Sequence, residues 1–207
     1  MDWQALVIEV GHGRLRVRPL DGARSIWLKV PGCDGTHIEN ELLRLGRPPE
    51  GTSGGRAVAI EVLGSSIDPT YIDDRPPQLE PGAEDTHAFA EYVAYDESEP
   101  FQSAMELLRA GRSHEARRAL RDFVAVHPLH IDSYHHLGNI AWGSGRLTQA
   151  LKYYEMAYRI GRLTVPAGFS GRLPWGIIEN RPFLRAPEAA RSTMASYRPR
   201  QASRRPA

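Results

Sequence analysis

The sequence predicts an α+β protein, in which a small β module precedes an all-α module of helical hairpins. Short apolar runs rich in β-branched residues, separated by glycine turns, occupy residues 3–66. An internal repeat with helical spacing of apolar residues occupies the second half of the chain. Charge divides the chain similarly: residues 1–66 are neutral, residues 67–99 carry −9 and residues 100–207 carry +10.

The β module is expected at residues 1–66, as four or five short strands around a small core. Residues 6–10 form an apolar run, and residues 14–18 alternate between arginine and apolar side chains, as a half-buried strand does. Two further strands are predicted at residues 25–30 and 57–63. Residues 38–45 are predicted to form a short helix before the last strand. This layout favours a small closed or partly open barrel.

Several short motifs in residues 3–66 resemble the OB-fold. They are Val7-Ile8-Glu9, the strand at residues 14–18, the Asp21-Gly22 turn and Val30-Pro31-Gly32. The resemblance implies a barrel whose outer face can hold single-stranded nucleic acid. Residues 67–86 follow, and their prolines and repelling carboxylates predict an acidic, proline-rich linker.

The helical module is expected at residues 87–186 and contains the repeat. Gly111 and Gly145 are 34 residues apart, and Ala116 and Ala150 have the same spacing. Helices are predicted at residues 100–110, 113–126, 133–142 and 148–160. Three polar residues are expected to cap the last three of these helices at their N-termini: Ser113, Asp132 and Thr148.

A period of 34 with these residue types resembles the tetratricopeptide repeat over residues 98–161. In the second copy, Gly138 and Ala150 let two antiparallel helices approach closely, and Leu137 and Tyr154 fill the space around them. The stretch from Asn180 to Ala186 is similar to one in some bacterial tetratricopeptide proteins and extends the likeness to residue 186. Residues 187–207 are rich in Arg, Ser, Ala and Pro, which predicts a basic disordered tail.

The resemblance implies a non-catalytic adaptor that binds a protein or peptide partner in a concave groove. The first helix of each hairpin lines that groove. Asn139 stands where peptide-binding members of the family hold ligand backbone, and Arg109 supplies a charged edge. An equally weighted alternative makes Phe101, Leu108 and Trp142 ordinary core residues. The predicted partner-binding residues are Phe101, Met105, Arg109, His135, Asn139 and Trp142.

A nucleic-acid-associated protein is the alternative function. Arg14, Arg16 and Arg18 share one strand face, and Trp27 offers a ring for base stacking. The neutral charge of residues 1–66 instead favours a solvated face, because phosphate binding usually needs a basic surface. The basic tail would add affinity for nucleic acid.

No pattern in the sequence predicts an enzyme, a cofactor or a metal site. Cys33 has His37 four residues on, but no third group to orient a catalytic pair. His135 and His136 point about 100° apart on a helix, so they do not chelate a metal together. No apolar run approaches 18 residues, which predicts no membrane span. A single cysteine is typical of a reducing, cytoplasmic setting.

Overall fold

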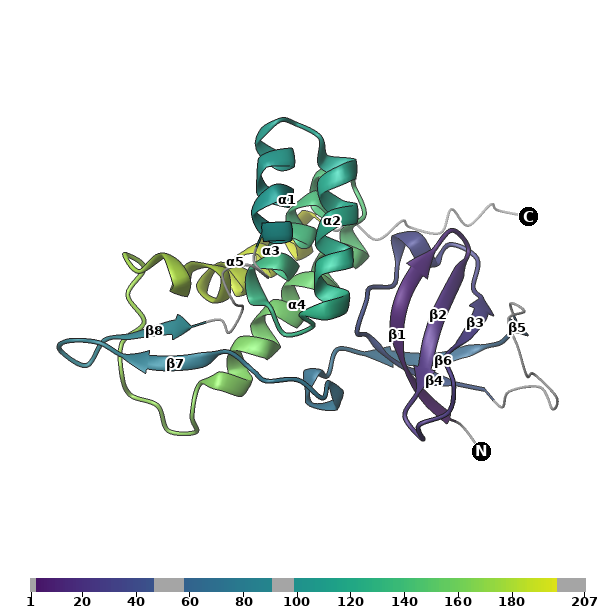
Figure 1. The fold of residues 1–207 in the computed structure, drawn as a ribbon, viewed down its shortest axis with the longest axis horizontal. Coiled ribbons are helices and arrows are strands. Elements are labelled where there is room, and N and C mark those ends of the chain that lie inside the picture. The colour runs from purple at the N-terminus through teal and green to yellow at the C-terminus, as the bar shows by residue number, and fades with distance from the viewer. Residues whose placement is uncertain (1–2, 47–57, 91–98, 197–207) are drawn as a thin grey trace, which may run out of the picture.

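A computed structural model describes residues 3–46, 58–90 and 99–196 of the chain. Figure 1 shows a six-stranded sheet at one end, the hairpin of strands β7 and β8 at the other, and helices between them. The predicted α+β class, with sheet first and helices second, is confirmed. The strands of the large sheet are β1 (Trp3–Gly11), β2 (Arg14–Pro19), β3 (Ile26–Lys29), β4 (Leu42–Leu45), β5 (Val58–Ala59) and β6 (Val62–Ser66).

The large sheet has the strand order β5-β3-β2-β1-β4-β6, and β5 pairs parallel to β3 while the other pairs are antiparallel. Its two end strands, β5 and β6, are separated in sequence by only Ile60 and Glu61. The two ends of the sheet therefore meet through one short stretch of chain, which makes the sheet curl. Buried residues of β1, β2, β3 and β4, together with Cys33 after β3, form an apolar core: Ala5, Val7, Val10, Leu15, Val17, Leu28, Cys33, Leu43 and Leu45.

The helix predicted at residues 38–45 is wrong. Residues 42–45 form β4, which lies between β1 and β6. The spacing of Leu42, Leu43 and Leu45 is compatible with both a helix and a strand. Backbone pairing with β1 makes this segment a strand. Asn40, just before β4, has a left-handed φ of 62°, which does not occur inside a right-handed helix.

Residues 67–90, which include the predicted linker, contain regular structure packed on the helices. They form the 3-10 turn η2 (Pro69–Tyr71), strand β7 (Gln78–Pro81) and strand β8 (His87–Ala90). Ile67, Ile72 and Phe89 are buried in the core of the helical module. The structure differs from the prediction because these apolar side chains are buried while the carboxylates around them, such as Asp73 and Glu80, stay exposed.

Five helices lie in the described residues: α1 (Glu99–Arg109), α2 (Ser113–Val126), α3 (Ile131–Gly143), α4 (Leu147–Thr164) and α5 (Arg181–Ser196). The two predicted hairpins, α1–α2 and α3–α4, are confirmed. The turns contain Gly111 and Gly145 with φ of 74° and 72°, a left-handed conformation that favours glycine. The predicted N-caps are wrong; α3, for example, starts after His130, whose Nδ1 accepts from the Ser133 N–H.

Small residues let the repeat helices pack closely. Ala116 and Ala150 are fully buried at equivalent places in the two hairpins. A Cβ on Gly138 of α3 would lie 2.4 Å from a ring carbon of Tyr154 on α4. The sequence motif thus reflects contact between neighbouring helices.

Helix α5 passes through Pro187 and continues to Ser196, beyond the predicted end of the helical module. The Phe183 ring sits on Gly161 of α4 and stacks on Tyr158, with the ring centroids 5.6 Å apart. Asn180, fully buried, accepts from the Phe89 N–H and donates to the His87 and Pro174 carbonyls. The Asn180–Ala186 stretch therefore ties β8 and α5 to the repeat. Residues 197–207 of the predicted tail lie outside the described residues.

Candidate functional site

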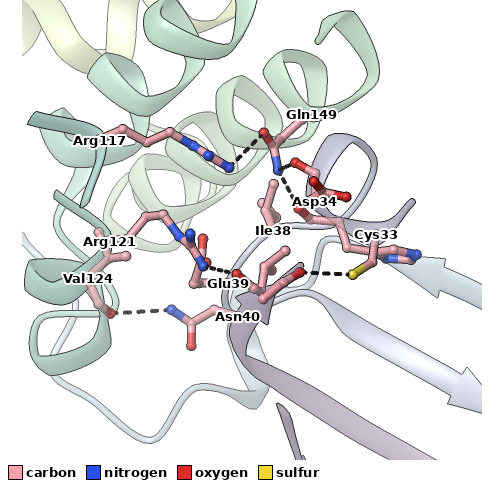
Figure 2. A network of polar contacts seen from close by, with 12 residues as sticks. Cys33, Asp34, Ile38, Glu39, Asn40, Arg117, Arg121, Val124 and Gln149 are labelled. Atoms are coloured by element: carbon pink, nitrogen blue, oxygen red, sulfur yellow. Dashed lines mark hydrogen bonds and ion pairs between the residues drawn. The ribbon is translucent and has the colours of Figure 1, made fainter. Parts of the chain in front are cut away.

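The loop at residues 33–41 of the β module lies against α2 and α4 (Figure 2). The Glu39 carboxylate, almost fully buried, accepts from Arg121 Nε at 2.6 Å and from the Tyr153 hydroxyl at 2.9 Å. Arg121 also donates to the Val10 carbonyl of β1. These bonds join both hairpins to the sheet through one carboxylate.

Glu41 forms a second buried contact beside the first. Its carboxylate accepts from Lys152 Nζ at 2.5 Å and from the Ile38 N–H at 3.1 Å, and lies 3.0 Å from His37 Nδ1. Burial alone would raise the pKa of Glu41, but the bond from His37 and the charge of Lys152 outweigh it and lower that pKa. A charged Glu41 therefore holds the loop on α4.

Neutral groups complete this interface. Asn40 Nδ2 lies 2.7 Å from the Tyr134 hydroxyl, and Gln149 Nε2 donates to the His37 carbonyl at 2.6 Å. Because these contacts come from α2, α3 and α4, the chain itself covers the side of the hairpins formed by α2 and α4. The surface that the loop covers is therefore not open to another molecule.

The predicted partner-binding residues divide into two groups. Phe101, Met105 and His135 are buried: the Phe101 ring, for example, lies 4.7 Å from the ring of His130. Arg109, Asn139 and Trp142 are exposed, with half of the Trp142 surface accessible. Asn139 and Trp142 share one stripe of α3 because they are three residues apart.

We use the name open face for the exposed residues Arg109, Asn139, Trp142, Trp175 and Arg185 on α1, α3, α5 and the loop before α5. Arg185 Cζ lies 5.3 Å from the centre of the Trp175 ring, a cation–π distance. The positive charge of Arg185 also acts on His135 and His136 of α3, which places α5 beside that stripe. No described hydrogen bond or ion pair joins Arg109 to α3. Arg185 lies in the Asn180–Ala186 stretch and is not among the partner-binding residues that the sequence predicts.

Hydrogen bonds fix the orientation of Asn139. Its Oδ1 accepts from the Tyr154 hydroxyl at 2.8 Å, so its Nδ2 faces His135 Nε2 at 3.2 Å. Since the amide donates there, the neutral His135 ring carries its proton on Nδ1. Among the described residues, no acceptor takes the second Nδ2 proton of Asn139.

His135 is expected to stay uncharged far below the ordinary range for histidine. Burial, with the neighbouring charges of His136 and Arg185, lowers its pKa to about 4. As the pH falls from about 6.5 to 4, His135 becomes protonated in the unfolded chain but stays neutral in the folded chain. The free energy of unfolding therefore decreases over this range. An NMR titration of the ring protons should show His135 titrating near pH 4, and titration near 6.5 would contradict its burial.

The residues of the alternative site lie together on the outer face of the sheet, which we call the β-face. Arg14, Arg16 and Arg18 are exposed on β2, while Leu15 and Val17 between them are buried, as predicted. Arg14 lies opposite Lys29 of β3, and Arg16 opposite Trp27. Arg14 Cζ lies 4.5 Å from the centre of the Trp27 ring. Glu9 is 4.0 Å from Arg16 and reduces the positive charge of the face.

Cys33 and His37 do not form a pair in the structure. Cys33 is buried, and its Sγ donates to the Gly11 carbonyl at 3.4 Å. Burial, with the negative charge of Asp34, raises the thiol pKa, so the sulfur stays protonated. Within the described ranges, no three His, Cys, Asp or Glu side chains are grouped to hold a metal ion. None of the helices described is long and apolar enough to cross a membrane.

Comparison with known families supports the repeat. The family model of the tetratricopeptide repeat matches residues 101–162, which span most of α1, all of α2 and α3, and α4 to near its end. The match and the two hairpins support a tetratricopeptide-like segment at residues 101–162. Tetratricopeptide repeats are generally non-catalytic modules of protein–protein interaction. Searches of curated proteins and of solved structures found no match to the chain.

Proposed function

We propose that the protein is a non-catalytic adaptor that binds a protein or peptide partner on the open face. The main support for this proposal is that the loop at residues 33–41 covers the opposite side of the hairpins. Glu39 and Glu41 of the loop, and Gln149 of α4, make the contacts. The exposed side chains of α3, with those of α5 beside them, are then left for another molecule. A cytoplasmic setting suits a chain whose single thiol is buried.

The open face has chemistry suited to a peptide. Trp142 and Trp175 are each about half exposed and supply flat apolar area. Asn139 offers an amide proton to a peptide carbonyl, and Arg109 and Arg185 offer guanidinium groups to carboxylates. These features favour an extended segment with acidic and apolar side chains.

Trp142→Ala should weaken peptide binding about tenfold or more, because exposed tryptophans at interfaces contribute much of the binding energy. The ligand is a peptide selected from a random phage-displayed library on the full chain, and calorimetry measures its affinity. Val126→Ala is the matched control, since Val126 is 72% exposed but lies on α2. Equal affinities for the two variants would contradict binding on the open face. Asn139→Ala is a poorer test, because it also removes the acceptor of the Tyr154 hydroxyl.

The register of the β-face favours a second candidate function, the binding of single-stranded nucleic acid. It sets three arginines and Lys29 around Trp27 on an exposed sheet surface. Guanidinium groups bind phosphates, and an indole ring stacks on bases.

Arg16→Glu should weaken the binding of a fluorescent oligouridylate at least tenfold. The slope of the logarithm of affinity against the logarithm of salt concentration should become shallower by about one. Arg162→Glu near the end of α4 is the control, since it makes the same charge change among residues such as Phe169 and Phe183, away from the β-face. Binding that both variants weaken equally would remove the β-face as the contact. An absence of salt-dependent binding by the parent would reject the candidate function.

A further inference from the structure

A cleft of about 910 Å³ lies between the β module and the helical module. Strands β1 and β2 line it from the sheet, and α2, which lies beside β1 in Figure 1, lines it from the helices. Residues 72–74, which follow η2, also line it. The cleft lies beside the loop at residues 33–41, where outer side chains of α2 are exposed. Its volume falls within the range of about 300–1,000 Å³ that is usual for ligand sites.

Arginines of both modules line this cleft. Arg16 and Arg18 extend the arginine row of β2 into it, and Arg118 of α2 lines it from the helical module. Arg16 lies 4.0 Å from Glu9. Arg18 and Arg118 are exposed, and neither makes an ion pair or a side-chain hydrogen bond within the described part of the chain. A guanidinium group in this state is available to phosphate oxygens.

Acidic side chains give the cleft a second kind of group. Glu39 is neutralised by Arg121, whose Nε lies 2.6 Å from the carboxylate. Asp73, Asp74 and Asp122 also line the cleft; all three are exposed, and none forms an ion pair among the described residues. Each of these carboxylates is a hydrogen-bond acceptor. A ligand of this cleft must therefore be anionic at one place and offer hydrogen-bond donors at another.

We infer that the cleft binds a nucleotide whose base carries an exocyclic amino group, within a single strand bound as in the second candidate function, on which the inference rests. The phosphate of this nucleotide accepts from Arg18 and Arg118. Its amino group donates to the carboxylate of Asp73 or Asp74, since acidic side chains accept from cytosine N4. Uracil carries the acceptor O4 in place of that amino group, so the same carboxylates repel it.

Continuity with the β-face favours nucleic acid over a peptide of mixed charge, which would also offer both kinds of group. Trp27 lies opposite Arg16, and Arg18 follows two residues further along β2 and lines the cleft. A strand that stacks on Trp27 therefore continues along arginines into the cleft. Bases of a single strand present their hydrogen-bonding edges to side chains, so the carboxylates can discriminate among them.

The test compares fluorescent oligocytidylate and oligouridylate of equal length on the full chain. The parent should bind oligocytidylate at least about fivefold more tightly at the same salt concentration. In the double variant Asp73→Asn with Asp74→Asn, this preference should fall below about twofold, because an amide donates to O4 as well as it accepts from an amino group. The matched control is Glu84→Gln with Asp85→Asn. It removes two exposed charges in the turn between β7 and β8 and should keep the preference.

Four other results would contradict this site. Equal affinities of the parent for the two oligomers would overturn the base preference but leave the β-face as a nucleic-acid site. A preference that the double variant retains would place the base outside the cleft. An absence of salt-dependent binding to either oligomer would reject the second candidate function and the cleft together. Weaker binding of the selected peptide by the double variant, with both oligomers unaffected, would assign the cleft to a peptide.

A variant on α2 locates the strand. Arg118→Glu should weaken oligocytidylate binding at least about fivefold, because Arg118 lines the cleft from the helical module. Arg162→Glu, the same charge change near the end of α4, should leave that affinity nearly unchanged. Equal effects of the two variants would overturn the cleft as the path of the strand.

Discussion

Glu39→Gln is expected to cost about 3 kcal/mol of the free energy of unfolding, because removing one member of a buried ion pair leaves the other charge uncompensated. Glu39 is buried between the sheet and both hairpins, and its carboxylate holds Arg121 and Tyr153. The amide keeps the shape but loses the charge. Urea unfolding, followed by tryptophan fluorescence and by helical circular dichroism, measures the change.

Glu115→Gln is the matched control for this change. Glu115 also pairs with an arginine, Arg112, but both side chains are more than half exposed, so the midpoint should barely move. The four tryptophans lie in both modules, so the two signals should change together in the parent chain. Equal midpoints for Glu39→Gln and Glu115→Gln would mean that the loop does not hold the modules together.

Gly138→Ala is expected to destabilise the second hairpin by about 3 kcal/mol, the upper end for overpacking a close helix contact. The new Cβ would lie 2.4 Å from the Tyr154 ring. That ring cannot easily retreat, because Tyr154 is buried and its hydroxyl is bonded to Asn139. For a chain of this size the midpoint of thermal unfolding should fall by about 6–12 °C.

Gly143→Ala makes the same change five residues further along α3, where a Cβ would meet nothing within 4 Å. Its midpoint should rise slightly or stay unchanged, since alanine loses less backbone entropy than glycine on folding. A Gly138→Ala chain that melts with the Gly143→Ala chain would contradict the close packing of α3 on α4.

The repeat could be predicted because its signal is local and occurs twice. Gly111 and Gly145, and Ala116 and Ala150, report contacts that recur in each hairpin, so their spacing carries the fold. β4 could not be predicted, because three leucines in four residues are compatible with both a helix and a strand. Only the pairing with β1, which is distant in sequence, determines that the segment is a strand. The packing of residues 67–90 was missed for a related reason. A few apolar side chains anchor this segment on the helices, whereas prolines and acidic residues dominate its composition.

Among the candidate site residues, exposure could not be derived from helical position alone. Phe101, Met105 and His135 occupy the expected helix stripe, yet they are buried in the helical module. The importance of Glu39 and Glu41 was also hidden, since charged residues in a loop usually face solvent. Their burial arises from helices more than 80 residues away in the chain, and no local pattern reports such a contact.

Hydrogen–deuterium exchange of the full chain, with and without a saturating amount of the selected peptide, directly tests whether a peptide binds on the open face. Binding on the open face predicts slower exchange in α3 and α5, at residues 131–143 and 181–196. Exchange in β2 and β3, and in the loop at residues 33–41, should not change. Protection confined to that loop and α2, or to the β-face, with α3 and α5 unaffected, would contradict the account.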